Sequence, residues 1–459
     1  MSRVERRVLA ALMTGFAAVY ITYGLFRHWH FYTSFDLAIF DQAVWHLARF
    51  ERPASSIKDM ANLFGDHFHP IIVLFAPAYW IVAAPETLIV LQGALLAAAI
   101  LPIFLFLRRR LEAGPALALC AAYGFFWGVQ HAAAHDVHEF AFAPVAIACA
   151  VLTMDRKQWP AFWVAIVAVM LVKEDLIPLA GFFGLYLALI GHRRQGVLLM
   201  GASTLGFAIV MRWLIPWLQG APYTYAGLYA SLLDEPWRIP VALVTPPDKL
   251  MAVLLWVAPF VFLPLGSPLL VLLVPLALVR LLPDNSSYWG ISFHYAAPLA
   301  PILVMSAGDG LGRLSRRLRA APRKGRWQAW AAGLSVLFSA ILPGNQPFWD
   351  LFSFEHFRPT ADQRVWADVA PLIPNDASVV AQAALLPHLS HRQELYLLRE
   401  GARDADLLVA AYGLSPWPEA NHDALAAIID ARKRAGYRPI FERDGWVLLE
   451  RTSPATDVR

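Results

Sequence analysis

The chain has 459 residues, of which 58% are apolar and only 16% are charged, and its mean hydropathy is +0.50. Soluble domains carry roughly 25% charged residues, so this composition indicates a membrane protein and excludes a disordered chain. Both cysteines, Cys120 and Cys149, lie inside apolar segments, which excludes a secreted disulfide scaffold. The net charge of +4 comes with cations clustered in short loops, as membrane orientation requires, and we expect no nucleic-acid partner.

The first apolar segment, residues 8–26, follows Arg3, Arg6 and Arg7. It is too long for a cleaved signal peptide and predicts a signal anchor with a cytoplasmic N-terminus. Further apolar segments follow, so the fold class is predicted to be a polytopic α-helical membrane protein with about 11 transmembrane helices. The later segments are residues 86–107, 115–131, 140–153, 159–172, 175–190, 197–218, 249–264, 268–282, 294–308 and 328–343.

Cationic loops give these segments a direction across the membrane. From a cytoplasmic N-terminus, eleven crossings place four cationic loops in the cytoplasm, at residues 108–110, 156–157, 193–194 and 313–326. The apolar segment 71–84 ends at Pro85, and counting it as a crossing moves residues 108–110 outside. We therefore expect an interfacial or re-entrant helix there, within an outer loop over residues 27–85.

The composition changes after the last apolar segment. Residues 344–459 have the charge density of a soluble protein and predict a small α/β domain, separate from a membrane domain over residues 1–343. The elements expected in it are strands at 379–384 and 407–411, a helix at 423–436, and a hairpin of 440–443 with 446–450 around Asp444-Gly445. Eleven crossings place this domain in the periplasm or its extracellular equivalent.

Acids and histidines gather in the loops of the outer face. Charged groups at the margin of hydrocarbon cost a few kcal/mol each unless they are paired, face a cavity or serve a function, so their convergence predicts a polar cavity. The candidate residues are Asp36, Asp41, Asp66, His67, His69, His135, Asp136, His138, Glu139, Lys173, Glu174, Asp175, Arg280, His294 and Tyr295.

Asp36 and Asp41 are the candidates for a general base that deprotonates an acceptor hydroxyl. The structural alternative is that Asp36, or Ser34, caps a short interfacial helix over residues 37–50. Five residues on a helix separate two side chains by about 140° around the axis, so we expect only one of the two aspartates to face the site.

The histidines leave three roles open: a metal site, ion pairs that join outer loops, and contact with substrate. If residues 66–69 are extended, His67 and His69 share a face, but no strong zinc spacing is present. The metal therefore stays unassigned, and a divalent cation is the one cofactor that the pattern admits. Lys173 and Arg280 are cations placed to hold a phosphate, with snorkelling to the interface as the alternative for Arg280.

Several strings together resemble the bacterial membrane family catalogued as domain of unknown function 2079 (DUF2079). They are Ser34 to Trp45, Asp66 to Pro70, His135 to Glu139, Leu171 to Asp175, Phe293 to Pro301 and Ala381 to Ser390. This family is grouped with the GT-C superfamily of membrane glycosyltransferases. The resemblance implies a sugar donor linked to polyprenyl phosphate on the outer face, and a catalytic acid in the first outer loop, where Asp36 or Asp41 is the matching position.

We therefore expect an inverting, GT-C-like glycosyltransferase of the cell envelope, located in the bacterial inner (cytoplasmic) membrane. Its partners are the lipid bilayer, a polyprenyl-phosphate-linked sugar, and a glycan, lipid or protein acceptor that the sequence does not identify. Two alternatives remain. One is a transporter or flippase with an ion path through Asp136, Glu139, Lys173 and Glu174. The other is a noncatalytic scaffold for envelope assembly.

Overall fold

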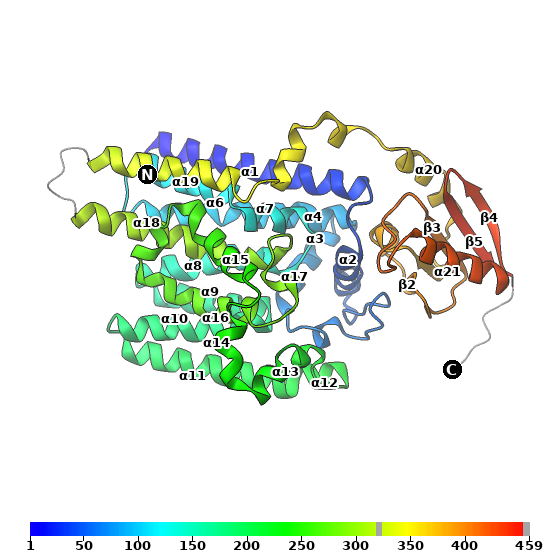
Figure 1. Ribbon diagram of the computed structural model, residues 1–459, viewed down its shortest axis with the longest axis horizontal. Helices are drawn as coiled ribbons and strands as arrows, with labels where there is room; N and C mark the ends of the chain where they lie inside the picture. Colours follow the sequence, from blue (N-terminus) through cyan, green and yellow to red (C-terminus); the bar gives the residue numbers. More distant parts are fainter. Residues whose placement is uncertain (318–323, 453–459) are drawn as a thin grey trace.

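The computed structural model describes residues 1–317 and 324–452 and consists mostly of helices, followed by a C-terminal mixed sheet (Figure 1). Within these residues, three helices are long and apolar enough to cross a membrane: Arg3–Trp29, Pro85–Leu107 and Arg193–Gln219. The first is α1, the second combines α4 (Pro85–Ala98) with α5 (Ile100–Leu107), and the third starts with α11 (Arg193–Ile209) and ends with α12 (Ile215–Gln219).

The other predicted membrane segments also fall on helices, several of them short. Their main helices are α6 (Ala113–Phe125), α7 (Trp127–Ala134), α8 (Ala143–Asp155), α9 (Trp159–Val172), α10 (Ile177–Leu189), α15 (Asp248–Val257), α16 (Leu273–Leu281), α18 (Leu299–Arg317) and α19 (Lys324–Ile341). Helices α8, α9 and α10 each carry a proline in the first turn, where its missing N–H leaves no donor unpaired. Residues 70–79 form two short helices, Pro70–Phe75 and α3 (Ala76–Tyr79), too short to cross a bilayer.

Ion pairs gather at the end of the bundle that lies away from the sheet. Arg108 pairs with Glu5 at 3.1 Å, and Arg110 pairs with Asp155 at 2.5 Å and with Asp309 at 3.1 Å. The start of α1, the end of α18 and the start of α19 lie at this same end (Figure 1). Of the cationic stretch 313–326, residues 318–323 are outside the described part of the chain. Arg108 and Arg110, two of the arginines used to orient the helices, therefore lie at the end of the bundle opposite the sheet.

The C-terminal sheet has five strands in the order β2-β1-β3-β5-β4. Strand β1 (Val379–Ala381) runs parallel to β2 (Leu395–Leu397) and β3 (Leu407–Ala411), and β5 (Trp446–Arg451) runs antiparallel to β3 and to β4 (Tyr437–Arg443). The predicted strand 379–384 is too long, because a 3-10 helix over Ala383–His388 begins there. Strand β2 and the helix α20 (Ala361–Val369) are present in the structure but were not predicted from the sequence. Of the expected domain 344–459, residues 453–459 lie outside the described range.

The two faces of the sheet pack against different partners. Leu408 and Ala410 of β3 contact a cluster that includes Ile429 of α21 (His422–Arg434). The alternate residues Leu407 and Val409 belong to a second cluster, which contains Ala38, Ile39 and Ala43 of α2 (Phe35–Ala48). Helix α2 therefore lies between the bundle and the sheet and shares a hydrophobic core with the C-terminal part of the chain (Figure 1).

Candidate active site

A polar cavity of about 130 Å³ lies at the sheet-facing end of the bundle. Its lining joins α2, the loop that follows it, and three further loops that enter from separate parts of the sequence. The lining residues are Asp36, Ile39, Phe40, Lys58, Leu63, Asp66, His67, His69, His138, Glu139, Lys173, Tyr225, Tyr288, His294 and Tyr295. Most of the acids and histidines that the sequence analysis selected from the outer loops thus meet at one place.

Asp36 lies in the first turn of α2, but it does not cap that helix. The Asp136 carboxylate accepts hydrogen bonds from the backbone N–H groups of Ser34 at 3.0 Å and Leu37 at 3.2 Å. Ser34 makes no side-chain cap of its own. The structural alternative of a local cap by Asp36 or Ser34 is therefore wrong: a carboxylate from a distant loop satisfies the helix N-terminus and leaves Asp36 free to face the cavity.

Two histidines surround the Asp36 carboxylate. Its Oδ2 atom lies 3.4 Å from Nε2 of His138 and 3.7 Å from Nε2 of His135, and 39% of the Asp36 side chain remains exposed. Burial alone raises the pKa of an acid, but these two imidazoles outweigh it and hold the pKa of Asp36 well below its usual value. Asp36 is therefore ionised and lies open to a molecule in the cavity.

Asp41 points away from the cavity and is fully buried. It accepts hydrogen bonds from the hydroxyl groups of Tyr79 and Ser390, and Nε2 of His391 lies 2.8 Å from its Oδ2 atom. Asp41 thus links α2 to the C-terminal part of the chain and has no access to a substrate. As the helical spacing predicted, only one of the two aspartates faces the cavity.

Lys173 forms a buried ion pair on the cavity wall. Its Nζ atom lies 3.0 Å from Oε1 of Glu139 and 5.1 Å from the centre of the Phe140 ring. Burial opposes the charge on each partner, yet the opposite charge prevails and keeps the pKa of Lys173 above, and that of Glu139 below, their ordinary values. The cavity therefore contains a permanent ammonium group suited to an anion.

Glu174 and Asp175, which follow Lys173 in the sequence, point into different parts of the structure. Glu174 accepts hydrogen bonds from the Phe68 backbone N–H and from the Tyr223 hydroxyl, both at 2.8 Å, and lies 2.5 Å from Nδ1 of His67. It therefore fixes the loop that carries His67. Asp175 lines a neighbouring apolar pocket instead.

Lys58 and Tyr225 are cavity residues that the sequence analysis missed. Lys58 forms an ion pair with Asp66, and the Tyr225 hydroxyl lies 3.1 Å both from Lys58 Nζ and from Asp66 Oδ1. Burial raises the pKa of Asp66, but His67 and Lys58 lower it below its ordinary value. Lys58 is the sole lysine between residues 27 and 85, and this lysine among the acids of the same loop was the sequence feature that could have identified it.

An apolar pocket of about 320 Å³ adjoins the polar cavity. Three residues line both spaces: His67, Tyr225 and Tyr288. The rest of the pocket is mostly apolar and includes Phe207 and Leu278. The two spaces together form a site with one polar and one apolar half.

Among the remaining candidates, His69, His294 and Tyr295 line the cavity, whereas Arg280 does not. Arg280 is buried behind it, donates to the Gly290 carbonyl at 3.2 Å and lies over the Trp256 ring. Burial excludes the alternative that Arg280 snorkels to the interface, and the side chain does not line the cavity.

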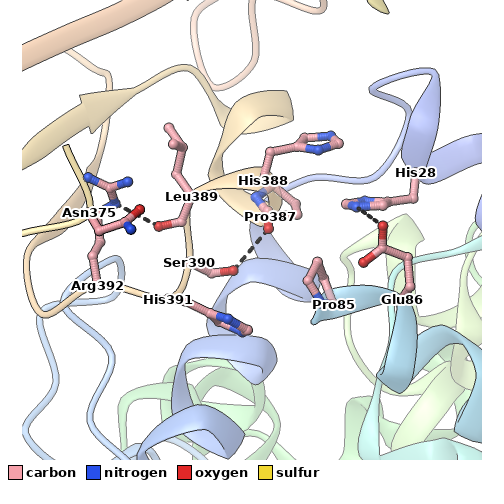
Figure 2. Close-up of a pocket in the computed structure, with 10 residues that line it drawn as sticks. All are labelled: His28, Pro85, Glu86, Asn375, Pro387, His388, Leu389, Ser390, His391 and Arg392. Carbon is pink, nitrogen blue, oxygen red and sulfur yellow. Dashed lines mark hydrogen bonds and ion pairs between the residues drawn. The ribbon is translucent and has the colours of Figure 1, made fainter. Parts of the chain in front are cut away.

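A second polar cavity, of about 220 Å³, lies between the C-terminal segment 387–392 and the ends of α1 and α4 (Figure 2). His28 of α1 stacks on His388 with ring centres 4.2 Å apart. Arg392 is occupied by backbone carbonyls, including that of Leu389 at 2.8 Å. Ser390 and His391 of this wall are the residues that hold Asp41. The second cavity therefore belongs to the joint between the sheet and the bundle.

Comparisons with known proteins agree with this architecture. The family described as "Predicted membrane protein (DUF2079)" matches residues 27–448. The crystal structure of ArnT from Cupriavidus metallidurans bound to undecaprenyl phosphate is similar to this chain, with a TM-score of 0.51 and 13% sequence identity over 96% of this chain and 97% of that chain. At this identity the similarity concerns the fold. No curated protein matches the chain.

Proposed function

The chain belongs to the DUF2079 family of predicted membrane proteins, and from this premise we propose that it is an integral membrane glycosyltransferase. It transfers a sugar from a polyprenyl-phosphate carrier to an envelope acceptor at the outer face of the inner membrane. The fold similarity to ArnT, whose crystal structure contains undecaprenyl phosphate, supports a carrier of this class.

The observation that carries the proposal is the junction of the polar cavity with the apolar pocket. A polyprenyl phosphate has an anionic head and a long apolar tail, and the two halves of the site match these two parts. Lys173 and Lys58 supply positive charge beside the shared wall, and Phe207 and Leu278 lie in the apolar half. Ligand sites of this kind combine an apolar lining with a few placed polar groups.

In this mechanism Asp36 acts as the general base. The acceptor hydroxyl oxygen attacks the anomeric carbon of the sugar and transfers its proton to the Asp36 carboxylate. The bond from the anomeric carbon to the phosphate oxygen breaks, and the polyprenyl phosphate leaves with the electron pair. Lys173, Lys58 and Tyr225 stabilise the charge on the leaving phosphate. One displacement inverts the anomeric centre and requires no second carboxylate as nucleophile.

The remaining candidates take supporting roles in this proposal. His67, His69 and Tyr295 contact substrate, Asp66 and Glu139 hold the lysines, Asp136 positions α2, and Asp41 and Glu174 maintain the architecture. We also propose eleven crossings, a membrane domain over residues 1–343, and residues 344–459 outside the cytoplasm. The ion pairs at the opposite end of the bundle, such as Arg110 with Asp155, support this polarity.

Complementation tests the proposal. In a deletion strain with a defined glycan phenotype, Asp36→Asn should fail to restore the glycan although the protein is present in the membrane. The matched control is Asp59→Asn, because Asp59 lies in the same outer loop with 70% of its side chain exposed and pairs with Arg403. Full complementation by Asp36→Asn would exclude Asp36 as the base.

A further inference from the structure

Three histidines form a cluster beside Asp36. His135 and His138 flank the turn after α7, and His294 enters from the loop before α18. One ring nitrogen from each histidine can be chosen so that all three lie within 4.8 Å of one another. Their rings are nearly parallel, with centres 3.5 Å apart for His138 and His294 and 5.5 Å apart for His135 and His138.

One of these imidazoles is buried without a partner. Neither nitrogen of His294, which is 3% exposed, makes a hydrogen bond to any described residue. Nε2 of the neighbouring His138, which is 8% exposed, makes no hydrogen bond, although the Asp36 carboxylate lies 3.4 Å from it. Buried polar groups in native proteins are nearly always satisfied, so the unpaired His294 imidazole beside His138 requires an explanation.

Protonation of His138 beside Asp36 and Glu139 leaves both nitrogens of His294 without a partner, and protonation of all three rings would place three imidazolium ions side by side. A bound metal ion satisfies three neutral imidazoles at once. Imidazole nitrogen is a preferred ligand of zinc and related divalent transition metals, and three histidines with one open position are typical of catalytic zinc sites. Coordination requires the His138 and His294 rings to open from their 22° stack so that both nitrogens face one ion.

We propose that His135, His138 and His294 bind one divalent transition-metal ion of the zinc class. The open coordination position faces the cavity, because His138 and His294 both line it. Glu139 supports the site from behind: its Oε2 atom lies 3.8 Å from Nδ1 of His138, on the other side of the ring from Nε2. Carboxylates in this relation fix the orientation of ligating histidines in known metal sites.

The role of the ion rests on the proposed function, whereas its binding does not. An acceptor hydroxyl bound at the open position becomes more acidic. Asp36, which lies 3.4 Å and 3.7 Å from two of the ligating rings, is placed to take the proton from that hydroxyl. Asp36 is thus the neighbour of the metal and not one of its required ligands.

Metal content measured on the full-length, tag-free protein in detergent tests the site. The protein is stripped with a chelator and reloaded with Zn²⁺ or Co²⁺. We expect one ion per chain after gel filtration and the visible absorption of Co²⁺ in a low-coordinate nitrogen site. His135→Gln, His138→Gln and His294→Gln should each weaken the affinity by at least about tenfold. His131→Gln is the matched control, because His131 lies on α7 outside the cluster and should retain the ion.

X-ray absorption of the zinc-loaded wild-type protein settles the ligand set even if a histidine variant fails to fold. Three imidazole ligands support the proposal. Wild-type protein that retains no Zn²⁺ or Co²⁺, or absorption data without imidazole ligands, would overturn it. Asp36→Asn should keep the ion, so a variant that binds metal but does not restore the glycan separates metal binding from the proposed transfer.

Discussion

Asp136 positions Asp36. The Asp136 carboxylate binds the backbone N–H groups of Ser34 and Leu37, on either side of Asp36, and so anchors the first turn of α2. The two residues lie 100 positions apart in the sequence, yet one fixes the backbone that carries the other. The negative charge of Asp136 also suits the positive end of the helix dipole. Asp36 therefore reaches the cavity because another carboxylate performs the capping.

Asp136→Ala should reduce sugar transfer without removing any residue of the cavity lining. Loss of a helix cap costs about 1 kcal/mol, and a misplaced α2 moves the base from its position. Asp136→Asn keeps an oxygen that accepts from the same backbone groups and should restore most of the activity. Thermal unfolding and glycan restoration are measured for both variants. If Asp136→Ala and Asp136→Asn reduce stability and glycan restoration equally, Asp136 acts through its charge and not as a cap.

Asp41→Asn should lower stability through the joint between α2 and the sheet. The amide replaces a buried acceptor for the Tyr79 and Ser390 hydroxyls and removes the ion pair with His391. We expect a loss of about 1–3 kcal/mol. Thermal unfolding and protease resistance of the C-terminal part check it, with Asp36→Asn as the comparison that should unfold like the wild type. Wild-type stability in Asp41→Asn would rule out this structural role.

Lys173→Gln should weaken binding of undecaprenyl phosphate by about tenfold or more. The substitution removes the ammonium from the cavity wall and leaves Glu139 as an uncompensated negative charge facing the anion. Native mass spectrometry with undecaprenyl phosphate measures the bound fraction. Lys433→Gln is the control, because this lysine pairs with Glu442 on the exposed surface of the C-terminal unit. Unchanged binding in Lys173→Gln would place the phosphate elsewhere.

Glu174→Gln should destabilise the protein at neutral pH and much less in acid. Burial raises the pKa of Glu174, but His67 and the hydrogen bonds to Glu174 lower it below the ordinary value of 4.5. An acid whose pKa is lower in the folded state stabilises that state at any pH above its pKa in the unfolded chain. This stabilisation is lost as the pH falls through the pKa of the folded state. The difference in melting temperature between variant and wild type should therefore be present at pH 7 and shrink progressively below pH 4.5. A difference independent of pH would contradict this charge-based role.

Much of the fold follows from local sequence properties. Apolar length predicts where the helices of the bundle lie, and the predicted segment 159–172 coincides with α9. The strand 407–411 and the hairpin around Asp444-Gly445 follow from apolar runs and turn residues in the same way. Breaks within helices are harder to predict: the segment 115–131 is interrupted at Phe126, whose extended backbone separates α6 from α7.

The sequence predicts most of the residues that form the candidate site, but it does not predict which of them contact each other. Charge sorting along the sequence predicts that Asp36, His138 and Lys173 lie at the same end of the bundle, whereas their partners depend on which loops meet in space. Nothing local in the sequence indicates that Asp136 caps α2 or that Ser390 holds Asp41. These contacts join residues at least 99 positions apart, so only the tertiary structure reveals them.

The most direct test of glycosyl transfer is mass spectrometry of membrane lipids from the deletion strain, complemented with either the wild-type or the Asp36→Asn gene. We expect a polyprenyl-phosphate-linked sugar to accumulate in the deletion strain, to persist with Asp36→Asn and to disappear with the wild type. Identical lipid-linked sugars in all three strains would exclude the proposed sugar transfer, and clearance of the accumulated lipid by Asp36→Asn would exclude Asp36 as its base.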